Sequence, residues 1–142
     1  MTRIDFHSGV PDKILYACRL VRKARRAADC SIVLLSADRA ASLALDQALW
    51  TFSEHDFLPH VLAADALAAS TPIILADGDP AELPHHEILI NLSSATPQHF
   101  ARFERMFEIV SNEEDDKAAG RARYRFYQQR GYPLTHHVAE SA

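Results

Sequence analysis

The chain has 142 residues, of which 24% are charged and 48% belong to a broad hydrophobic set, with only 4 Gly and 7 Pro. This composition predicts one compact globular domain spanning residues 1–142 and excludes a disordered or fibrous chain. The 15 basic residues are outnumbered by 19 acidic ones, which leaves a net charge of −4. A protein that coats a phosphate backbone is usually strongly basic, so we expect any association with DNA to be local or indirect.

The first thirty residues carry charges such as Arg3 and Asp12 and no apolar signal core, and charges also interrupt the later apolar stretches. These features predict a cytoplasmic protein with no membrane association. Cys18 and Cys30 lack CxxC spacing, so we expect no disulfide. Cys18 falls among apolar residues of a predicted helix and is expected to be a buried thiol.

Strand-like and helix-like segments alternate along the chain, which predicts an α/β domain with a mostly parallel central sheet flanked by helices. In chain order, the sequence first predicts a strand at Arg3–His7, a helix over about Lys13–Ala28 and a strand at Ser31–Leu35. A second helix, capped by Ser36 or Asp38, ends near Leu49. Three more strands follow at Pro72–Ala76, Glu87–Asn91 and about Phe107–Ser111.

The last helix is the most clearly marked. Ser111 and Glu114 have the spacing of a capping box, acidic residues fill the first turn, and Gly131 followed by Pro133 ends the helix. Residues 132–136 can then form an edge strand or a tail.

The first predicted helix has an apolar face and a basic face. The apolar face offers core candidates at Ile14, Leu15, Cys18 and Val21. The basic face consists of Arg19, Arg22, Lys23 and Arg26. Such a stripe is most often the solvated side of a helix, and the alternative is direct nucleic-acid contact by this face.

The usual motifs of nucleotide chemistry are absent from the sequence. The turn after the first strand has one glycine, Gly9, and there is no GxGxxG, GxxxxGK[ST] or GxSxG sequence. The sequence therefore predicts a Rossmann-like sheet without a nucleotide-binding loop. The alternative kept open is a small cytosolic nucleotide- or phosphate-handling enzyme that uses the carboxyl edge of the sheet, helped by the basic face or by histidines.

Two histidine pairs, His85-His86 and His136-His137, could supply imidazole ligands or an acid/base pair. Neither pair has the spacing of a metal site, and adjacent residues of a strand point to opposite faces. We expect solvated histidines of a loop or tail, no bound metal and no cofactor.

One stripe of the last helix combines cations with an aromatic ring. Lys117, Arg121, Tyr124 and Gln128 follow helical spacing, with Arg125 beside them. The opposite face, made of Ala118, Ala119, Ala122 and Phe126, is predicted to dock on the sheet. Forked cations beside a ring suit an acidic peptide with a hydrophobic end. From periodicity alone, a tyrosine that merely reaches out at the rim of the core is an equal alternative.

A second candidate surface follows the second helix, where Trp50 and Phe57 come close together in the sequence. Aromatic residues at an irregular, partly exposed segment are typical anchors of protein interfaces. The alternative is that Trp50 closes one end of the core.

Four sequence pieces together resemble the chi subunit of bacterial DNA polymerase III, an accessory protein of the clamp-loader complex. They are LDQALW, FLPH, EILINL and RARYRFYQQRGY, and the resemblance extends over essentially the whole chain. It implies a non-catalytic adaptor of the replicative holoenzyme that binds the acidic, Phe-terminated tail of single-stranded-DNA-binding protein and, separately, the psi subunit.

The resemblance also implies roles for particular residues. The positions that match the family's tail-binding residues are Val110, Lys117, Arg121, Tyr124 and Arg125. The positions that match its psi-facing surface are Trp50 and Phe57. The pattern gives no place to His136 and His137.

Overall fold

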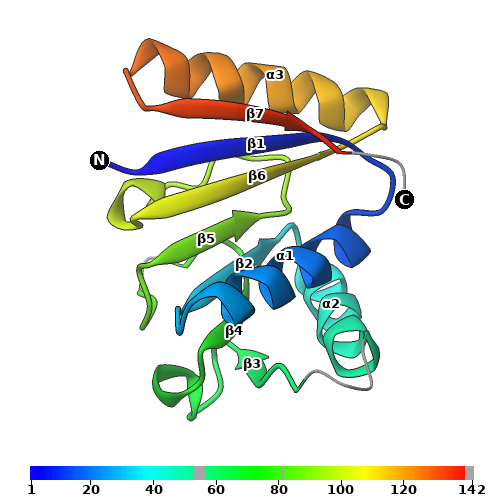
Figure 1. Ribbon diagram of the computed structural model, residues 1–142, viewed down its shortest axis with the longest axis vertical. Coiled ribbons are helices and arrows are strands. Elements are labelled where there is room, and N and C mark those ends of the chain that lie inside the picture. Colours follow the sequence, from blue (N-terminus) through cyan, green and yellow to red (C-terminus); the bar gives the residue numbers. More distant parts are fainter. Residues whose placement is uncertain (53–56, 81, 140–142) are drawn as a thin grey trace.

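The protein folds around a seven-stranded sheet in which every adjacent pair of strands is parallel (Figure 1). The computed structural model describes residues 1–52, 57–80 and 82–139. The strands are β1 (Arg3–Val10), β2 (Ile32–Ser36), β3 (His60–Leu62), β4 (Ile73–Asp77), β5 (Ile88–Asn91), β6 (Arg105–Ser111) and β7 (Leu134–Val138). Their spatial order is β3-β4-β2-β5-β6-β1-β7. The predicted α/β architecture is confirmed.

Helices cover both faces of the sheet, so the domain has three layers (Figure 1). The helices are α1 (Lys13–Ala27), α2 (Arg39–Thr51) and α3 (Glu114–Gln129), and two short 3-10 helices are η1 (Ala68–Ser70) and η2 (Phe100–Arg102). Apolar side chains of α1 and α2 pack on one face, and those of α3, η1 and η2 pack on the other. In the described part of the chain, no helix has the length and apolar character that crossing a bilayer would require.

The central strand β2 is buried along its whole length, as its run of Ile, Val and Leu predicts. Its alternate side chains serve different layers: Ile32 and Leu34 pack under α1 and α2, whereas Val33 and Leu35 pack on the α3 side. Cys18 and Cys30 are buried free thiols in the first of these layers, and burial raises the pKa of Cys18 to about 11.

The helix starts match the prediction in part. Asp38 caps α2 by accepting a hydrogen bond from the Ala41 N–H at 2.8 Å. The predicted capping box at Ser111 is wrong, because Ser111 is still part of β6 and no side chain caps the first turn of α3. Instead, the Asp116 carboxylate accepts the Ser111 N–H at 2.7 Å and pairs with Lys13 at 3.1 Å, which fixes the junction between β6 and α3.

The predicted core faces of two helices are wrong in part. Leu15 is exposed, and Ala17 takes the place in the core beside Cys18 and Val21. On α3, Phe126 packs against the core as predicted, but Ala118 and Ala122 face solvent. The residues buried against the sheet are Gly120, Arg123 and Tyr127. The reason is that the buried face of α3 carries a charged residue with a partner inside the protein, which hydrophobic periodicity does not register.

That partner is Glu108 of β6, which is fully buried. Arg123 Nε lies 3.2 Å from Glu108 Oε1, and Arg123 Nη1 donates to the Ser94 carbonyl at 2.9 Å. The Tyr127 hydroxyl donates to Glu108 Oε2 at 2.6 Å, and the Asn91 side-chain amide donates to Glu108 Oε1 at 2.9 Å. Burial raises the pKa of Glu108, and the Arg123 guanidinium opposes that rise. These contacts join α3 to the sheet beneath it.

The segment after α3 forms the edge strand β7 rather than a tail. It pairs in parallel with β1, so that Phe6 lies beside His136 and His7 beside His137. Strand β3 at the opposite edge was not predicted, because it has only three residues, which is too few for the alternation of polar and apolar residues that marks a strand.

Candidate functional site

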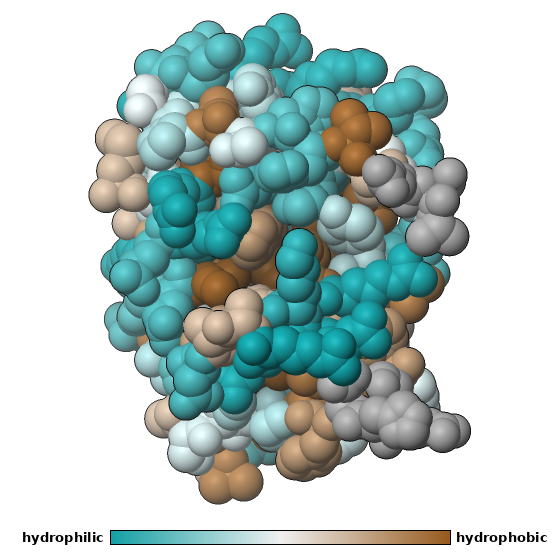
Figure 2. All heavy atoms as spheres, in the orientation of Figure 1, coloured by the Kyte–Doolittle hydropathy of each residue, from teal (hydrophilic) through white to brown (hydrophobic). Residues whose placement is uncertain are grey.

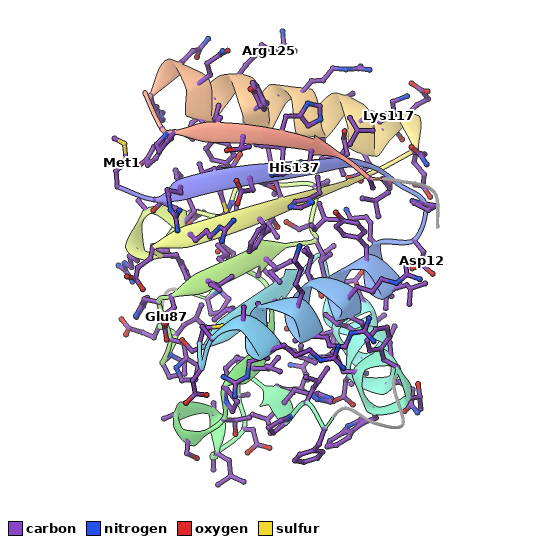
Figure 3. All side chains as sticks on the ribbon, viewed as in Figure 1. Met1, Asp12, Glu87, Lys117, Arg125 and His137 are labelled. Carbon is purple, nitrogen blue, oxygen red and sulfur yellow. The ribbon has the colours of Figure 1, made fainter. Side chains whose placement is uncertain are left out.

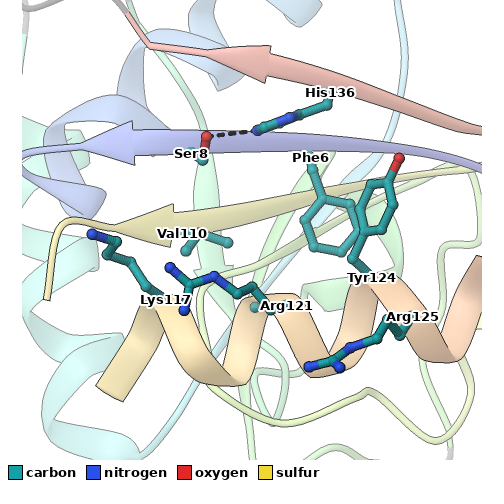
Figure 4. A pocket seen from close by; sticks show the side chains of 9 residues that line it. Phe6, Ser8, Val110, Lys117, Arg121, Tyr124, Arg125 and His136 are labelled. Carbon is teal, nitrogen blue, oxygen red and sulfur yellow. Dashed lines mark hydrogen bonds between the residues drawn. The ribbon is translucent and has the colours of Figure 1, made fainter. Parts of the chain in front are cut away.

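A cavity of about 550 Å³ opens between α3 and the neighbouring strands β1, β6 and β7 (Figure 4). Its lining residues are Phe6, Ser8, Val110, Lys117, Gly120, Arg121, Tyr124, Arg125 and His136. We call this cavity the α3 pocket. All five residues predicted to bind an acidic tail line it, so the fold brings together positions that lie on β6 and over two turns of α3.

The floor of the α3 pocket is apolar because Phe6 and Val110 point from the sheet toward α3. Gly120 allows the helix to come close to β6 here: a Cβ atom at this position would lie 2.8 Å from Val110 Cγ2. Such a distance is shorter than any real Cβ contact, so a larger residue would force the helix or Val110 to move.

Tyr124 forms one wall of the α3 pocket. Its ring meets Phe6 in an edge-on arrangement with centroids 5.1 Å apart, and it is half-buried against the core layer under α3. The two sequence-based interpretations of Tyr124 therefore describe one position, because the ring packs at the rim of the core and also faces the cavity (Figure 4).

The rim of the α3 pocket is basic. Lys117 pairs with Glu114 at 3.5 Å on the helix surface, while Arg121 and Arg125 are exposed. Within residues 1–52, 57–80 and 82–139, neither guanidinium has an ion-pair partner, and no carboxylate lines the cavity. Figure 3 shows Lys117 and Arg125 at separate turns of α3, and Figure 2 shows that the side chains over this helix are mostly hydrophilic. The pocket thus combines an apolar floor with three cations, of which Arg121 and Arg125 have no ion-pair partner among the described residues.

Four lining residues were not predicted as site residues, namely Phe6, Ser8, Gly120 and His136. The first two become neighbours of α3 only because β1 lies between β6 and β7. The expectation that His136 and His137 lie in a loop or tail is wrong, since both belong to β7. His85 and His86 do lie in a loop, where His85 Nε2 is 2.6 Å from the Thr71 carbonyl oxygen.

The opposite side of β1 carries another group of titratable residues. His7 is buried, its Nδ1 hydrogen-bonds the Tyr16 hydroxyl, and its ring stacks on His137 with centroids 4.9 Å apart. Arg105 pairs with Asp5 at 2.7 Å on the same face. Burial, with a smaller effect of His137, lowers the pKa of His7 to about 4. In the described part of the chain, no three potential ligands among His, Cys, Asp and Glu gather into a metal site.

The second candidate surface is exposed. Trp50 is 52% exposed at the end of α2, and Phe57 is 76% exposed with its ring centroid 6.2 Å from that of Trp50. Trp50 rests on the buried His60, with ring centroids 4.4 Å apart. The alternative that Trp50 closes the core is therefore wrong. Leu43, two turns earlier on α2, is also exposed. We call Trp50 and Phe57 the aromatic surface.

The carboxyl edge of the sheet, where the alternative enzyme would bind a phosphate, is acidic. A cavity of about 650 Å³ at this edge is lined by the carboxylates of Asp12, Glu113, Asp115 and Asp116. Its lysine, Lys13, is already paired with Asp116. Like charges would repel a phosphate here.

The basic face of α1 does not line that cavity either. Arg22 lies over the Phe52 ring at 4.8 Å, and Arg19 and Lys23 are exposed. No described feature of the carboxyl edge therefore favours nucleotide binding.

The amino-acid sequence matches the family described as DNA polymerase III chi subunit, HolC, over residues 1–135. It is 38% identical over 141 residues to DNA polymerase III subunit chi of Pseudomonas aeruginosa, covering 96% of each chain. The chi subunit of Haemophilus influenzae is 29% identical with 72% of each chain covered, and that of Escherichia coli is 26% identical with 72% of this chain and 70% of the relative covered. The chain therefore belongs to the DNA polymerase III chi subunit family and is a DNA replication protein of the polymerase III holoenzyme.

Proposed function

We propose that this protein is a non-catalytic, cytoplasmic adaptor that binds the acidic C-terminal tail of single-stranded-DNA-binding protein in the α3 pocket. The observation that supports this function is the pairing of an apolar floor with a basic rim in one cavity. A tail that ends in Phe and carries several carboxylates has the complementary chemistry. Association with DNA is then indirect, through the bound protein, in keeping with the net charge of −4.

The α3 pocket suits each part of such a tail. The terminal phenyl ring fits the apolar floor of Phe6 and Val110, where the Tyr124 ring can cover it edge-on. The guanidinium groups of Arg121 and Arg125 can pair with carboxylates in a bidentate manner, and Lys117 adds a point charge.

A binding experiment separates this function from the alternative enzyme. The protein is titrated with a synthetic peptide of several Asp residues ending in Phe, and in parallel with nucleotides. We expect the peptide to bind, more weakly as salt rises, and the nucleotides not to bind. Nucleotide binding without peptide binding would reverse the assignment. A peptide with the terminal Phe replaced by Ala controls for simple attraction between opposite charges.

Replacing Arg121 by Ala is expected to weaken peptide binding by about 1.5–3 kcal/mol, the amount typical of a lost hydrogen bond between charged groups. The measurement is calorimetric titration at fixed salt. Arg19→Ala is the matched control, because it removes the same charge from an exposed position on α1, across the sheet from the pocket. A folded Arg121→Ala protein that binds the peptide like the original chain would remove Arg121 from the site.

The aromatic surface supports a second contact, which we assign to a psi-like subunit of the clamp loader. Trp50 and Phe57 are large, exposed and in reach of one another, as interface anchors usually are. They belong to α2 and the segment after it, whereas the α3 pocket lies on the opposite face of the sheet. The two contacts can therefore form at the same time.

Replacing Trp50 by Ala is expected to cost about 2 kcal/mol or more of psi-subunit affinity. Peptide affinity at the α3 pocket should stay unchanged, and the melting curve should move little because the ring is half exposed. Leu67→Ala, which also removes an exposed apolar side chain, is the control. If Trp50→Ala abolished peptide binding in a stable protein, the separation of the two surfaces would be wrong.

A further inference from the structure

His136 is one of the four pocket residues that neither the sequence stripe nor the family resemblance assigns. It lies on β7 directly beside Phe6 of β1, and its side chain faces α3. His136 Nε2 is 2.6 Å from Ser8 Oγ, and its ring centroid is 6.5 Å from that of Tyr124 (Figure 4). The imidazole thus forms the wall of the α3 pocket that lies across from the helix.

His137, the next residue, lies on the other side of the strand. Its ring stacks on His7, and its Nε2 is 4.0 Å from Asp5 Oδ1. The alternation of side chains along β7 therefore places one histidine of the pair in the α3 pocket and the other on the α1 side of the sheet. This arrangement supplies a matched pair of neighbouring residues with the same titratable group.

The hydrogen bond between His136 and Ser8 depends on the protonation of the ring. A neutral imidazole that carries its proton on Nδ1 accepts the Ser8 hydroxyl proton at Nε2, and we assign this tautomer to the empty pocket. A protonated imidazole has two N–H donors and no acceptor, so Nε2–H must then donate to Ser8 Oγ. The Ser8 hydroxyl proton becomes free to turn toward another acceptor. Protonation thus adds both a positive charge and a hydroxyl donor beside the cavity.

The polar groups that face His136 in the pocket come from two elements, α3 and β1. From α3 the pocket receives Lys117, Arg121 and Arg125 with the phenol of Tyr124, and from β1 it receives Ser8. No carboxylate lines the described cavity. A bound peptide would bring carboxylates to it, and a nearby carboxylate favours the protonated form of an imidazole. Because linkage is reciprocal, an anion that favours the proton on His136 must also bind more tightly when that proton is present.

We propose that His136 is a further ligand-binding residue of the α3 pocket, and that it couples capture of an acidic peptide to uptake of a proton, with Ser8 supplying the hydroxyl donor that protonation releases. This proposal rests on the proposed function, since it takes an anionic peptide as the ligand. Histidine is suited to the role because its charge ordinarily changes between about pH 5 and 8. The carboxylates of the peptide stay ionised over most of that range.

The test is calorimetric titration of the full chain with the acidic, Phe-terminated peptide at about pH 8 and at about pH 6. We expect affinity to rise about two- to five-fold at the lower pH, the range for one partly exposed charge pair. Titration in two buffers of different ionisation enthalpy should show net proton uptake on binding. In His136→Gln both effects should disappear, and in His137→Gln both should remain. Ser8→Ala should reduce the gain at low pH.

The outcomes separate this proposal from the proposed function. Absence of peptide binding at about pH 8, where imidazoles are largely neutral, would contradict the function itself. Peptide binding with the same pH dependence and proton uptake in His136→Gln as in the original chain would overturn only the role of His136. If the pH dependence and the proton uptake were lost in His137→Gln and kept in His136→Gln, they would arise on the α1 side of the sheet, and the role of His136 would be overturned. A full gain at low pH in Ser8→Ala would overturn the part given to the hydroxyl. Melting curves at both pH values establish that each variant is folded.

Discussion

Replacing Arg123 by Leu is expected to lower the free energy of unfolding by about 3–5 kcal/mol, the usual cost of leaving a buried charge without its partner. Glu108 is fully buried and Arg123 is only 3% exposed, so water does not replace the lost guanidinium. Tyr127 and Asn91 still donate hydrogen bonds to the Glu108 carboxylate, but neither carries a positive charge. Urea unfolding at neutral pH measures the change.

A double variant tests the cause of this loss. Glu108→Leu combined with Arg123→Leu removes both charges, and buried ion pairs can often be replaced by apolar residues at little cost. We therefore expect the double variant to be more stable than Arg123→Leu alone, although Tyr127 then loses its acceptor. If the double variant were less stable than Arg123→Leu, the stability lost in Arg123→Leu would come from the packing of the long side chains and not from an unpaired charge.

Acidification is expected to destabilise the protein by about 3 kcal/mol at most between about pH 6.5 and about pH 4, through His7. The pKa of His7 is lowered to about 4 in the folded protein from the ordinary 6.5. In this window the unfolded chain binds a proton that the folded chain does not, so unfolding becomes easier as the pH falls. The contribution of neutral His7 to the free energy of unfolding is fully present above about pH 6.5 and is lost by about pH 4.

The matched variant for this prediction is His7→Phe, which keeps an aromatic ring between Tyr16 and Phe107 and removes the titratable group. Unfolding midpoints in urea are compared across the pH range. The fall in stability should be clearly smaller in His7→Phe than in the original chain. His86→Gln, which changes an exposed loop histidine, should leave the fall intact. An equal fall in His7→Phe would mean that other groups cause the acid sensitivity.

The strands of the core could be predicted because their residues are apolar in unbroken runs. Strands β2, β4 and β5 carry Ile, Val and Leu that are buried on both faces of the sheet, and such runs need no knowledge of the rest of the fold. The face of α3 that docks on the sheet could not be predicted in this way. Its buried residues include Arg123, which is tolerated inside the protein only because Glu108 lies opposite on β6.

The basic rim of the candidate site could be predicted from one helix, since Lys117, Arg121 and Arg125 repeat with the period of α3. The strand side of the pocket could not. Phe6 and His136 are far apart in the sequence and become neighbours only because β7 pairs with β1. Strand order depends on long-range packing, which local patterns of residues do not encode.

The position of β1 in the sheet has a consequence for how the protein forms during synthesis. Both neighbours of β1 come from the second half of the chain, because β6 spans Arg105–Ser111 and β7 spans Leu134–Val138. As the ribosome releases the chain from its N-terminus, β1 has no strand to pair with until β6 has emerged. Contacts between such distant segments form slowly. We therefore expect β2, α2 and β4 to associate first, and the α3 pocket to be among the last features of the nascent protein to take shape.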